Sequence, residues 1–362
     1  MSEWKKVKLG EICKISAGGD RPSLVSEKET NHCQIPIYSN GIDNQGLYGF
    51  TDKAKIKGNA ITITGRGANA GTVFYRETAY YPIIRLLSLV PNNDIINPRY
   101  LYYLIKDRTF LSTGSAQPQI TVPNISNYEI NYNTNLDIQR RIATILSRYD
   151  SLIENYQKQI KLLEESAQRL YKEWFIDLRF PGHENTKIVD GVPEGWEKKS
   201  VTDVFEIKYG KDHKLLKDGT NPVYGTGGVM RYVEKSLCTG ESVLIPRKGS
   251  LNNILLVDGT FWTIDTMFYS IPKEDNVAKI VYFYLKGVDM YSFNIGAAVP
   301  SMTVNILSGM KLLIPKDDIR KEFEKIVSIY FIRMQSLQFQ IRHLTEARDR
   351  LLPKLMSGEI EV

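Results

Sequence analysis

The sequence repeats itself once, in order, along its 362 residues. The clearest pair is GSAQPQITV (114–122) and GAAVPSMTV (296–304), which share Gly, Ala, Pro, Thr and Val at matching positions. Both stretches are polar and contain proline, so we expect each to be a loop that enters a strand. A loop that occurs twice, far apart in the chain, points to two homologous halves.

Further segments pair in the same order along the two halves. The pairs are WKKVKLGEICKISAGG (4–19) with WEKKSVTDVFEIKYG (196–210), IPIYSNGID (35–43) with NPVYGTGGV (221–229), YYPIIRLLSLVP (80–91) with FWTIDTMFYSIP (261–272), RYLYYLIKD (99–107) with KIVYFYLKG (279–287), and DIQRRIATILSRYD (137–150) with DIRKEFEKIVSIYF (318–331). The spacing between partners drifts slowly, as insertions and deletions in loops produce. Chance matches would not stay in order, so the chain is a duplication.

Each half begins with a β-rich part. Short β-branched and aromatic runs are bounded by Gly, Pro, Asn and Asp, which is typical of strands and tight turns. These runs are ITIT (61–64), GTVFY (71–75), RLLSLV (85–90), SVLIP (242–246) and NILLV (253–257). A short helix is expected over PRYLYYLIKD (98–107) and over AKIVYFYLK (278–286). The predicted fold class is α+β, with two β-rich α/β domains.

Each half ends with a long helix. Apolar residues run from Ile142 to Trp174 in alternating steps of four and three, and a matching stripe runs from Phe323 to Leu355. Only Arg348 breaks the second stripe. This spacing is the 3.5-residue repeat of a left-handed coiled coil. About 37 residues at 1.5 Å rise give each helix a length of roughly 55 Å.

The stripes are compatible with core faces, with a homodimeric coiled coil or with an intramolecular pair. We favour an intramolecular antiparallel pair, because two matched stripes in one chain meet at high effective concentration. Such a pair would place one β-rich domain at each end, about a pseudo-two-fold axis. Acidic residues mark the helix starts at Asp137 and at 317–318. The first helix is expected to end near RFPG (179–182), and the second near Pro353 or MSG (356–358).

Composition narrows the function classes. The net charge of +6 permits nucleic-acid binding without requiring it. Three scattered cysteines suit a reducing compartment and give no disulfide framework, and four histidines away from any cysteine pair argue against structural zinc. The sequence has no apolar run of membrane-spanning length, and its start lacks an apolar signal-peptide core. We therefore expect a cytoplasmic protein.

The long helices carry the most specific family signal. Two segments resemble the specificity (S) subunit of type I restriction–modification systems. They are QRRIATILSRYDSLIENYQKQIKLLEESAQRLYKEWFIDLRFPG (139–182) and the ending RDRLLPKLMSGEIEV (348–362). The two Trp-initiated openings and the two G-A-x-x-P loops support this resemblance. It implies target recognition domains over 1–136 and 181–317, a central conserved helix over 137–180 and a distal conserved helix over 318–362.

The resemblance also implies a function and partners. Each head would read one half of a split, asymmetric target in double-stranded DNA, and the helices would fix the unread gap. Two modification (methyltransferase) subunits would bind the helices, and restriction/translocase subunits would join them. S-adenosylmethionine, ATP and Mg would belong to those partner subunits, with no cofactor in this chain.

Catalytic motifs are not convincing. GRGANAG (65–71) imitates a glycine-rich nucleotide loop, but it leads into the strand run TVFY where such a motif needs a helix N-terminus. NPRY (97–100) resembles the Asn-Pro-Pro-Tyr signature of N-methyltransferases; we interpret it as a helix entry with Asn97 as cap and Pro98 in the first turn. The sequence contains no GxxxxGK[ST] motif. These features predict a non-catalytic chain.

Base reading requires Arg, Lys, Asn, Gln or Ser on rigid loops, and phosphate contacts require cations. The DNA-binding candidates in the first half are Ser39, Asn40, Lys53, Lys55, Lys57, Arg66, Asn69, Gln117 and Gln119. Those in the second half are Lys211, His213, Lys214, Arg247, Lys248, Asn252 and Asn253. We give most weight to Arg66 and Arg247, which match at the 181-residue offset. For each candidate the alternative is a solvated loop residue.

The helices supply candidates for a partner-subunit interface. These are Arg140, Arg141, Lys158, Arg169, Trp174 and Phe175. The alternatives are solvated charges and, for the two aromatic residues, a cap on the coiled-coil seam. For the whole chain, the alternatives to DNA specificity are a coiled-coil scaffold whose heads bind protein or carbohydrate, and a fused enzyme with its own chemistry.

Overall fold

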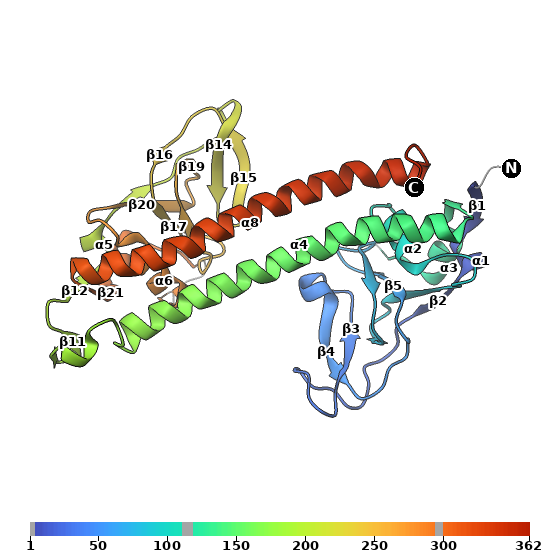
Figure 1. Cartoon of the computed structure of the whole chain (residues 1–362), viewed down its shortest axis with the longest axis horizontal. Helices are drawn as coiled ribbons and strands as arrows, with labels where there is room; N and C mark the ends of the chain where they lie inside the picture. Colours follow the sequence, from blue (N-terminus) through green and yellow to red (C-terminus); the bar gives the residue numbers. More distant parts are fainter. Residues whose placement is uncertain (1–3, 111–118, 294–299) are drawn as a thin grey trace. The chain divides into compact units, whose positions relative to one another are not determined.

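A computed structural model describes residues 4–110, 119–293 and 300–362. The chain forms two compact units, one of residues 1–156 with 339–362 and one of residues 157–338. Each unit holds one β-rich head and a part of each long helix, α4 (Leu136–Tyr171) and α8 (Asp317–Ser357) (Figure 1). The helices confirm the predicted α+β class.

The first head is built from short elements. They are β1 (Trp4–Lys8), α1 (Leu9–Ile12), β2 (Cys13–Ala17), β3 (Ile35–Tyr38), β4 (Leu47–Thr51), β5 (Ala60–Ile63), β6 (Val73–Arg76), β7 (Tyr81–Pro82), β8 (Leu87–Pro91), α2 (Pro98–Ile105), α3 (Val122–Ser126) and β9 (Glu129–Asn133). One sheet has the order β2-β8-β5-β6, a second has the order β4-β3-β7, and β1 pairs with β9.

The second head repeats this plan. Its elements are β10 (Ile188–Val189), β11 (Val192–Pro193), β12 (Glu197–Ser200), α5 (Val201–Val204), β13 (Phe205–Tyr209), β14 (Asp218–Gly225), β15 (Gly228–Val233), β16 (Cys238–Thr239), β17 (Ser242–Pro246), β18 (Leu255–Val257), β19 (Thr260–Thr263), β20 (Met267–Pro272), α6 (Ala278–Lys286), α7 (Val304–Gly309) and β21 (Lys311–Ile314). The order β13-β20-β17-β18 copies the first head's larger sheet, and β12 pairs with β21 as β1 pairs with β9. The duplication therefore extends to the topology.

The residues of the two helix stripes are all buried or half-buried, as the heptads predict. In the first unit, Ile142 and Leu146 near the start of α4 share a core with Leu355 near the end of α8. In the second unit, Ala167 near the end of α4 shares a core with Phe323 near the start of α8. In both units α4 and α8 therefore pack antiparallel, as expected.

The helix ends differ from the prediction in part. Helix α4 ends at Tyr171 and continues as one π-helical turn, Lys172–Ile176, before Leu178 takes a left-handed φ of 55°. The chain thus leaves the helix before RFPG. Helix α8 runs through Pro353 to Ser357, so the MSG end is confirmed.

The repeated loop leads into a helix in both heads, and the predicted strand entry is wrong. Thr121 is the N-cap residue of α3, where its backbone N–H donates to Asn124 Oδ1 at 2.9 Å. Thr303 caps α7 and accepts from the Ile306 N–H at 3.2 Å. Threonine is a favoured N-cap residue at the start of a helix. The β-branched residues around it in the repeat favoured a strand instead, which is why the prediction failed.

Candidate nucleic-acid interface

Three loops of the first head meet at the Asn40 side chain. Asn40 Oδ1 accepts from the Gly65 N–H at 2.7 Å, and Asn40 Nδ2 donates to the Ile84 carbonyl at 2.5 Å. The amide thus links the loop after β3, the loop after β5 and the turn before β8. Since both ends of this amide are bonded to backbone, the structure gives Asn40 a positioning role.

Arg66 and Gln119 lie side by side in this cluster. They form an isolated antiparallel bridge, and the Ile120 N–H donates to the Gly65 carbonyl at 2.9 Å. Arg66 is exposed. Gln117 lies outside the described residues.

A buried arginine braces the loop after β3. Arg76 is 3% exposed, its guanidinium lies 3.6 Å from the Tyr38 ring centroid, and its Nη2 donates to the Gln45 carbonyl at 2.7 Å. Burial lowers the pKa of Arg76 from its usual value. The Ser39 N–H closes the loop on the Gly46 carbonyl at 2.8 Å. Tyr38 therefore packs within the head.

The remaining candidates of the first head are exposed. Lys53, Lys55, Lys57 and Asn69 all face solvent. Lys55 Nζ lies 4.3 Å from the ring centroid of Tyr81, a residue of β7 just before the turn that leads to β8. An exposed row of cations beside a loop cluster is suited to phosphate contacts.

The second head places Lys248, and not Arg247, at the position of Arg66. Lys248 bridges Ser301 as Arg66 bridges Gln119, and the Met302 N–H donates to the Arg247 carbonyl at 2.9 Å. The predicted equivalence of Arg66 with Arg247 is therefore wrong by one residue. The first head has one more residue between paired positions of its β5 and β8 strands than the second head has between β17 and β20, which shifts the register.

Arg247 is engaged within its own head. Its Nη1 donates to the Asp265 carbonyl at 2.6 Å, and its guanidinium lies 4.6 Å from the Tyr209 ring centroid. Asn252 and Asn253 are likewise engaged: Asn252 Nδ2 donates to Asp289 Oδ1 at 3.1 Å, and Asn253 Nδ2 donates to the Thr226 carbonyl at 2.7 Å. We infer that these three residues shape the loops of this head.

The segment after β13 presents the other candidates. Lys211 and Lys214 are exposed, and His213 is half-buried. The Lys211 carbonyl accepts from Trp262 Nε1 at 2.9 Å, which fixes the start of the segment. Lys211 follows Tyr209 by two residues, so this segment begins beside the Arg247 guanidinium.

Polar anchors fix each head to the first turns of its helix. In the first unit, the buried Gln139 of α4 accepts from the Asn97 N–H at 2.7 Å and donates to the Asn133 carbonyl at 2.7 Å. Asn97 in turn caps α2, accepting from the Tyr100 N–H at 3.0 Å, which confirms the helix-entry interpretation of NPRY.

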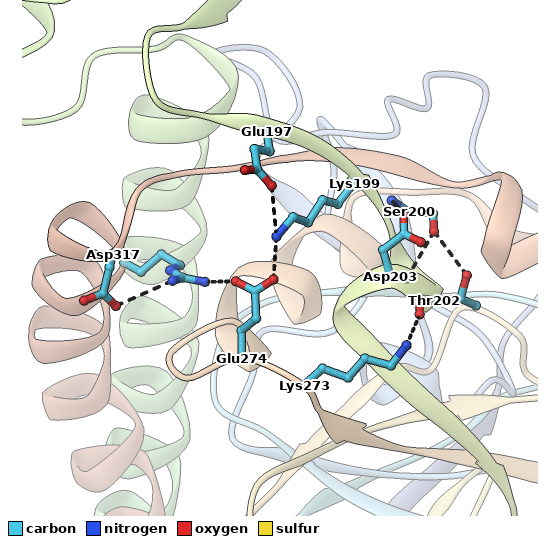
Figure 2. Close-up of polar contacts among 9 residues, drawn as sticks. Glu197, Lys199, Ser200, Thr202, Asp203, Lys273, Glu274 and Asp317 are labelled. Atoms are coloured by element: carbon cyan, nitrogen blue, oxygen red, sulfur yellow. Dashed lines mark hydrogen bonds and ion pairs between the residues drawn. The ribbon is translucent and has the colours of Figure 1, made fainter.

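The second head uses charges at the same place. Glu274, in the loop between β20 and α6, is bonded to Lys199 of β12 at 2.5 Å (Figure 2). It also forms an ion pair with the guanidinium of Arg320 of α8. Arg320 also reaches Asp317 at 3.5 Å. The Lys199 hydrogen bond, opposed by partial burial and helped by Arg320, lowers the pKa of the Glu274 carboxyl below its usual value.

The helix candidates separate into two groups. Arg140, Arg141, Lys158 and Arg169 are exposed. Trp174 and Phe175 are only 6% and 4% exposed, and both rings pack against Phe323 at centroid distances of 5.8 and 4.8 Å. Placing these two rings at a partner interface is therefore wrong. They close the coiled-coil seam, which was the alternative.

The described residues hold neither a metal-binding cluster nor a membrane-spanning helix. Within residues 4–110, 119–293 and 300–362, no group of three or more His, Cys, Asp or Glu side chains is arranged to hold a metal ion. Among the helices described, none combines the length and the apolar character needed to cross a membrane.

This geometry is a pair of similar heads, each with an exposed basic loop cluster and each anchored to a helix of an antiparallel pair. The chain belongs to the type I restriction–modification DNA specificity family: the family model "Type I restriction modification DNA specificity domain" matches residues 1–165 and 193–343. It is thus a DNA-specificity protein and not one of the catalytic components of such systems, as the sequence predicted.

Relatives agree with this assignment over the full length. The MjaIX specificity subunit of Methanocaldococcus jannaschii is 27% identical, covering 99% of this chain and 93% of that protein. The HindI specificity subunit of Haemophilus influenzae is 24% identical over 99% of this chain and all (100%) of that protein. A crystal structure of a type I S subunit from M. genitalium has the same fold, with a TM-score of 0.68 at 20% identity over 98% of this chain and 96% of that one. None of these relatives supports the scaffold alternative.

The turn that joins the first head's candidates was not predicted from the sequence. Ile84 and Arg85 are both exposed and lie beside Asn40 and the Arg66 loop. They stand inside the apolar run YYPIIRLLSLVP, whose letters predict a strand. An Ile-Arg pair does not predict a turn, since tight turns between two strands usually contain Asn, Asp or Gly. Only the tertiary structure identifies it.

Proposed function

We propose that this protein recognises a bipartite, asymmetric DNA target, with one half-site read by each head and the gap set by the two long helices. The heads are residues 1–136 and 181–317, and the helices 137–180 and 318–362. One observation carries the proposal: the same structural position holds Arg66 with Gln119 in one head and Lys248 with Ser301 in the other. Different donors and acceptors on one frame favour different bases.

The DNA contacts are assigned from exposure and from position in the loops. We assign base contacts to the exposed Arg66, Asn69 and Lys248 and to the half-buried Gln119 that bridges Arg66. We assign phosphate contacts to five exposed lysines, which are Lys53, Lys55, Lys57, Lys211 and Lys214. Ser39, Asn40, His213, Arg247, Asn252 and Asn253 would shape the loops that present these contacts.

The partners are the other subunits of the system. We propose two modification subunits, bound through exposed helix charges at Arg140, Arg141, Lys158 and Arg169, and restriction/translocase subunits that join them. S-adenosylmethionine, ATP and Mg would act in those subunits, and the assembly would work in the cytoplasm.

The test is DNA binding by the assembled methyltransferase. Methylated positions in DNA exposed to the assembly would first define the target. Gel shifts would then compare that duplex with duplexes changed in the left half, the right half or the gap. We expect binding to disappear on changing either half or the gap length, and to tolerate changes in the gap sequence. Equal binding to random duplexes would contradict the proposal.

A further inference from the structure

The turn between β7 and β8 has a backbone that its own residues disfavour. The Leu86 N–H donates to the Ile83 carbonyl at 3.0 Å, which closes a four-residue turn. Its two central residues, Ile84 and Arg85, have φ of 52° and 61°. A positive φ is a genuine outlier for a β-branched residue, and turns of this type normally carry Asn, Asp or Gly.

The surrounding structure holds this turn in place. The Ile84 N–H donates to the Gly19 carbonyl at 2.9 Å, and the Arg85 N–H donates to the Gly18 carbonyl at 2.8 Å. A Cβ at Gly18 would lie 2.7 Å from the Pro82 carbonyl carbon, so the two segments are in close backbone contact. Asn40 Nδ2 holds the Ile84 carbonyl. The side chains are thus projected from a rigid support.

Both side chains point to solvent. Ile84 is 53% exposed, although it is a large aliphatic residue, and Arg85 is exposed. Within the described residues, Arg85 has no carboxylate partner at ion-pair distance. Packing inside the head therefore does not explain either residue.

Candidates that the sequence predicted separately surround this turn. A Cβ at Gly65, next to Arg66, would lie 3.0 Å from the Arg85 carbonyl and 3.2 Å from the Ile120 carbonyl, next to Gln119. A Cβ at Gly19 would lie 3.8 Å from Lys55 Nζ. The turn therefore lies close both to the loops that carry Arg66 and Gln119 and to Lys55.

We propose that the Ile84–Arg85 turn is a base-reading element of the first head. Ile84 makes an apolar contact with a base edge in the groove, of the kind that a thymine methyl group offers, and Arg85 donates to an acceptor on an adjacent base. This inference rests on the proposed DNA-reading function of the head. It adds two specificity residues and explains why a strained backbone is retained at an exposed position.

The second head lacks this feature. Its matching turn holds Asp265 and Thr266 before β20, and neither has a positive φ. The Asp265 carbonyl is bonded to Arg247 Nη1 at 2.6 Å. The two heads therefore differ in the element that we assign to reading.

The test uses Ile84→Gly and Arg85→Asn in the assembled methyltransferase. Glycine and asparagine accept positive φ, so both variants should melt at or above the wild-type temperature. At one or more positions of the first head's half-site, we expect discrimination between the right and wrong base to fall by about 10-fold. The other half-site should be read normally. Asn276→Gly, at φ 62° in the second head, is the matched control and should leave discrimination unchanged.

Unchanged discrimination in both variants would overturn the inference, as would an equal reduction at both half-sites. If Ile84→Gly lowers the melting temperature, the loss of discrimination in Arg85→Asn alone tests the inference. Failure of the proposed function looks different: the wild-type assembly itself would show no sequence preference.

Discussion

Arg348 of α8 forms an ion pair with Asp150 of α4, with Nη1 and Oδ1 2.7 Å apart. The second carboxylate oxygen of Asp150 accepts from the Tyr103 hydroxyl of α2 at 2.5 Å. Arg348 is the one polar residue in its helix stripe, so the break in the heptads is where the helix pair is joined to the first head. A single polar residue in such a seam is an attested way to fix helix register.

Removing one partner of this pair should destabilise the first unit. Asp150 and Arg348 have side chains that are 23% and 19% exposed, so Arg348→Met leaves a half-buried carboxylate with fewer donors. We expect the free energy of unfolding, measured by urea denaturation, to fall by about 2 kcal/mol. The double variant with Asp150→Asn should be destabilised by less than the sum of the single variants. Strict additivity would show that the two residues are not coupled.

Replacing Trp174 should lower the stability of the fold, and any loss of subunit assembly should be a consequence of that. Trp174→Ala removes a buried ring that packs on Phe323, and we expect unfolding free energy to fall by about 3–5 kcal/mol. Ile176→Ala is the matched control, because Ile176 is 59% exposed and two residues away; its effect should stay within about 0.5 kcal/mol. A Trp174 variant of normal stability that fails to bind modification subunits would restore the interface assignment.

Acid should weaken the second head's anchor on α8. Because the Lys199 hydrogen bond lowers the pKa of Glu274 in the folded state, this carboxylate stabilises the fold above its unfolded-state pKa. That stabilisation disappears as pH falls through the lowered folded-state pKa. In urea denaturation from pH 7 downward, the stability of Glu274→Gln should therefore decrease less than that of the wild type. Parallel pH profiles for the two proteins would contradict the role of Glu274.

The lysine row of the first head should govern salt dependence without governing specificity. Changing Lys53, Lys55 and Lys57 to Gln should make the slope of log K against log salt shallower by about 0.9 for each phosphate that the protein no longer neutralises. Discrimination between bases should remain, since phosphate contacts carry no sequence information directly. Binding isotherms at several salt concentrations give this slope. An unaltered slope in the triple variant would identify the row as a solvated edge.

The duplication followed from the sequence because matching segments occur in the same order in both halves, and the helix stripes and short strands followed because they rest on local patterns. Ile142 and Phe323 were assigned to the helix seam by spacing alone, and both are buried. The loop register did not follow. Because the strand connections differ in length by one residue, the residue of the second head that is structurally equivalent to Arg66 is Lys248 and not Arg247. No local sequence pattern records such a shift.

The candidate site was predicted at the level of loops and less well for individual residues. Composition marks Asn40, Asn252 and Asn253 as possible base readers, but their amides are bonded to backbone or to a neighbouring carboxylate. Conversely, Ile84 has no polar group and lies in a strand-like run. Whether a loop amide is bonded internally depends on partners distant in the chain, and a single sequence does not reveal those partners.

The two-head mode of recognition is tested most directly by reciprocal variants at the position that the duplication shares. Arg66→Ala and Lys248→Ala would each be assembled with modification subunits, and methylation would be measured on duplexes with every single-base change in either half-site. Two independent reading heads predict that Arg66→Ala relaxes one half-site, Lys248→Ala relaxes the other, and neither alters the required gap. Relaxation of the same half-site by both variants, or of both half-sites by either one, would contradict it.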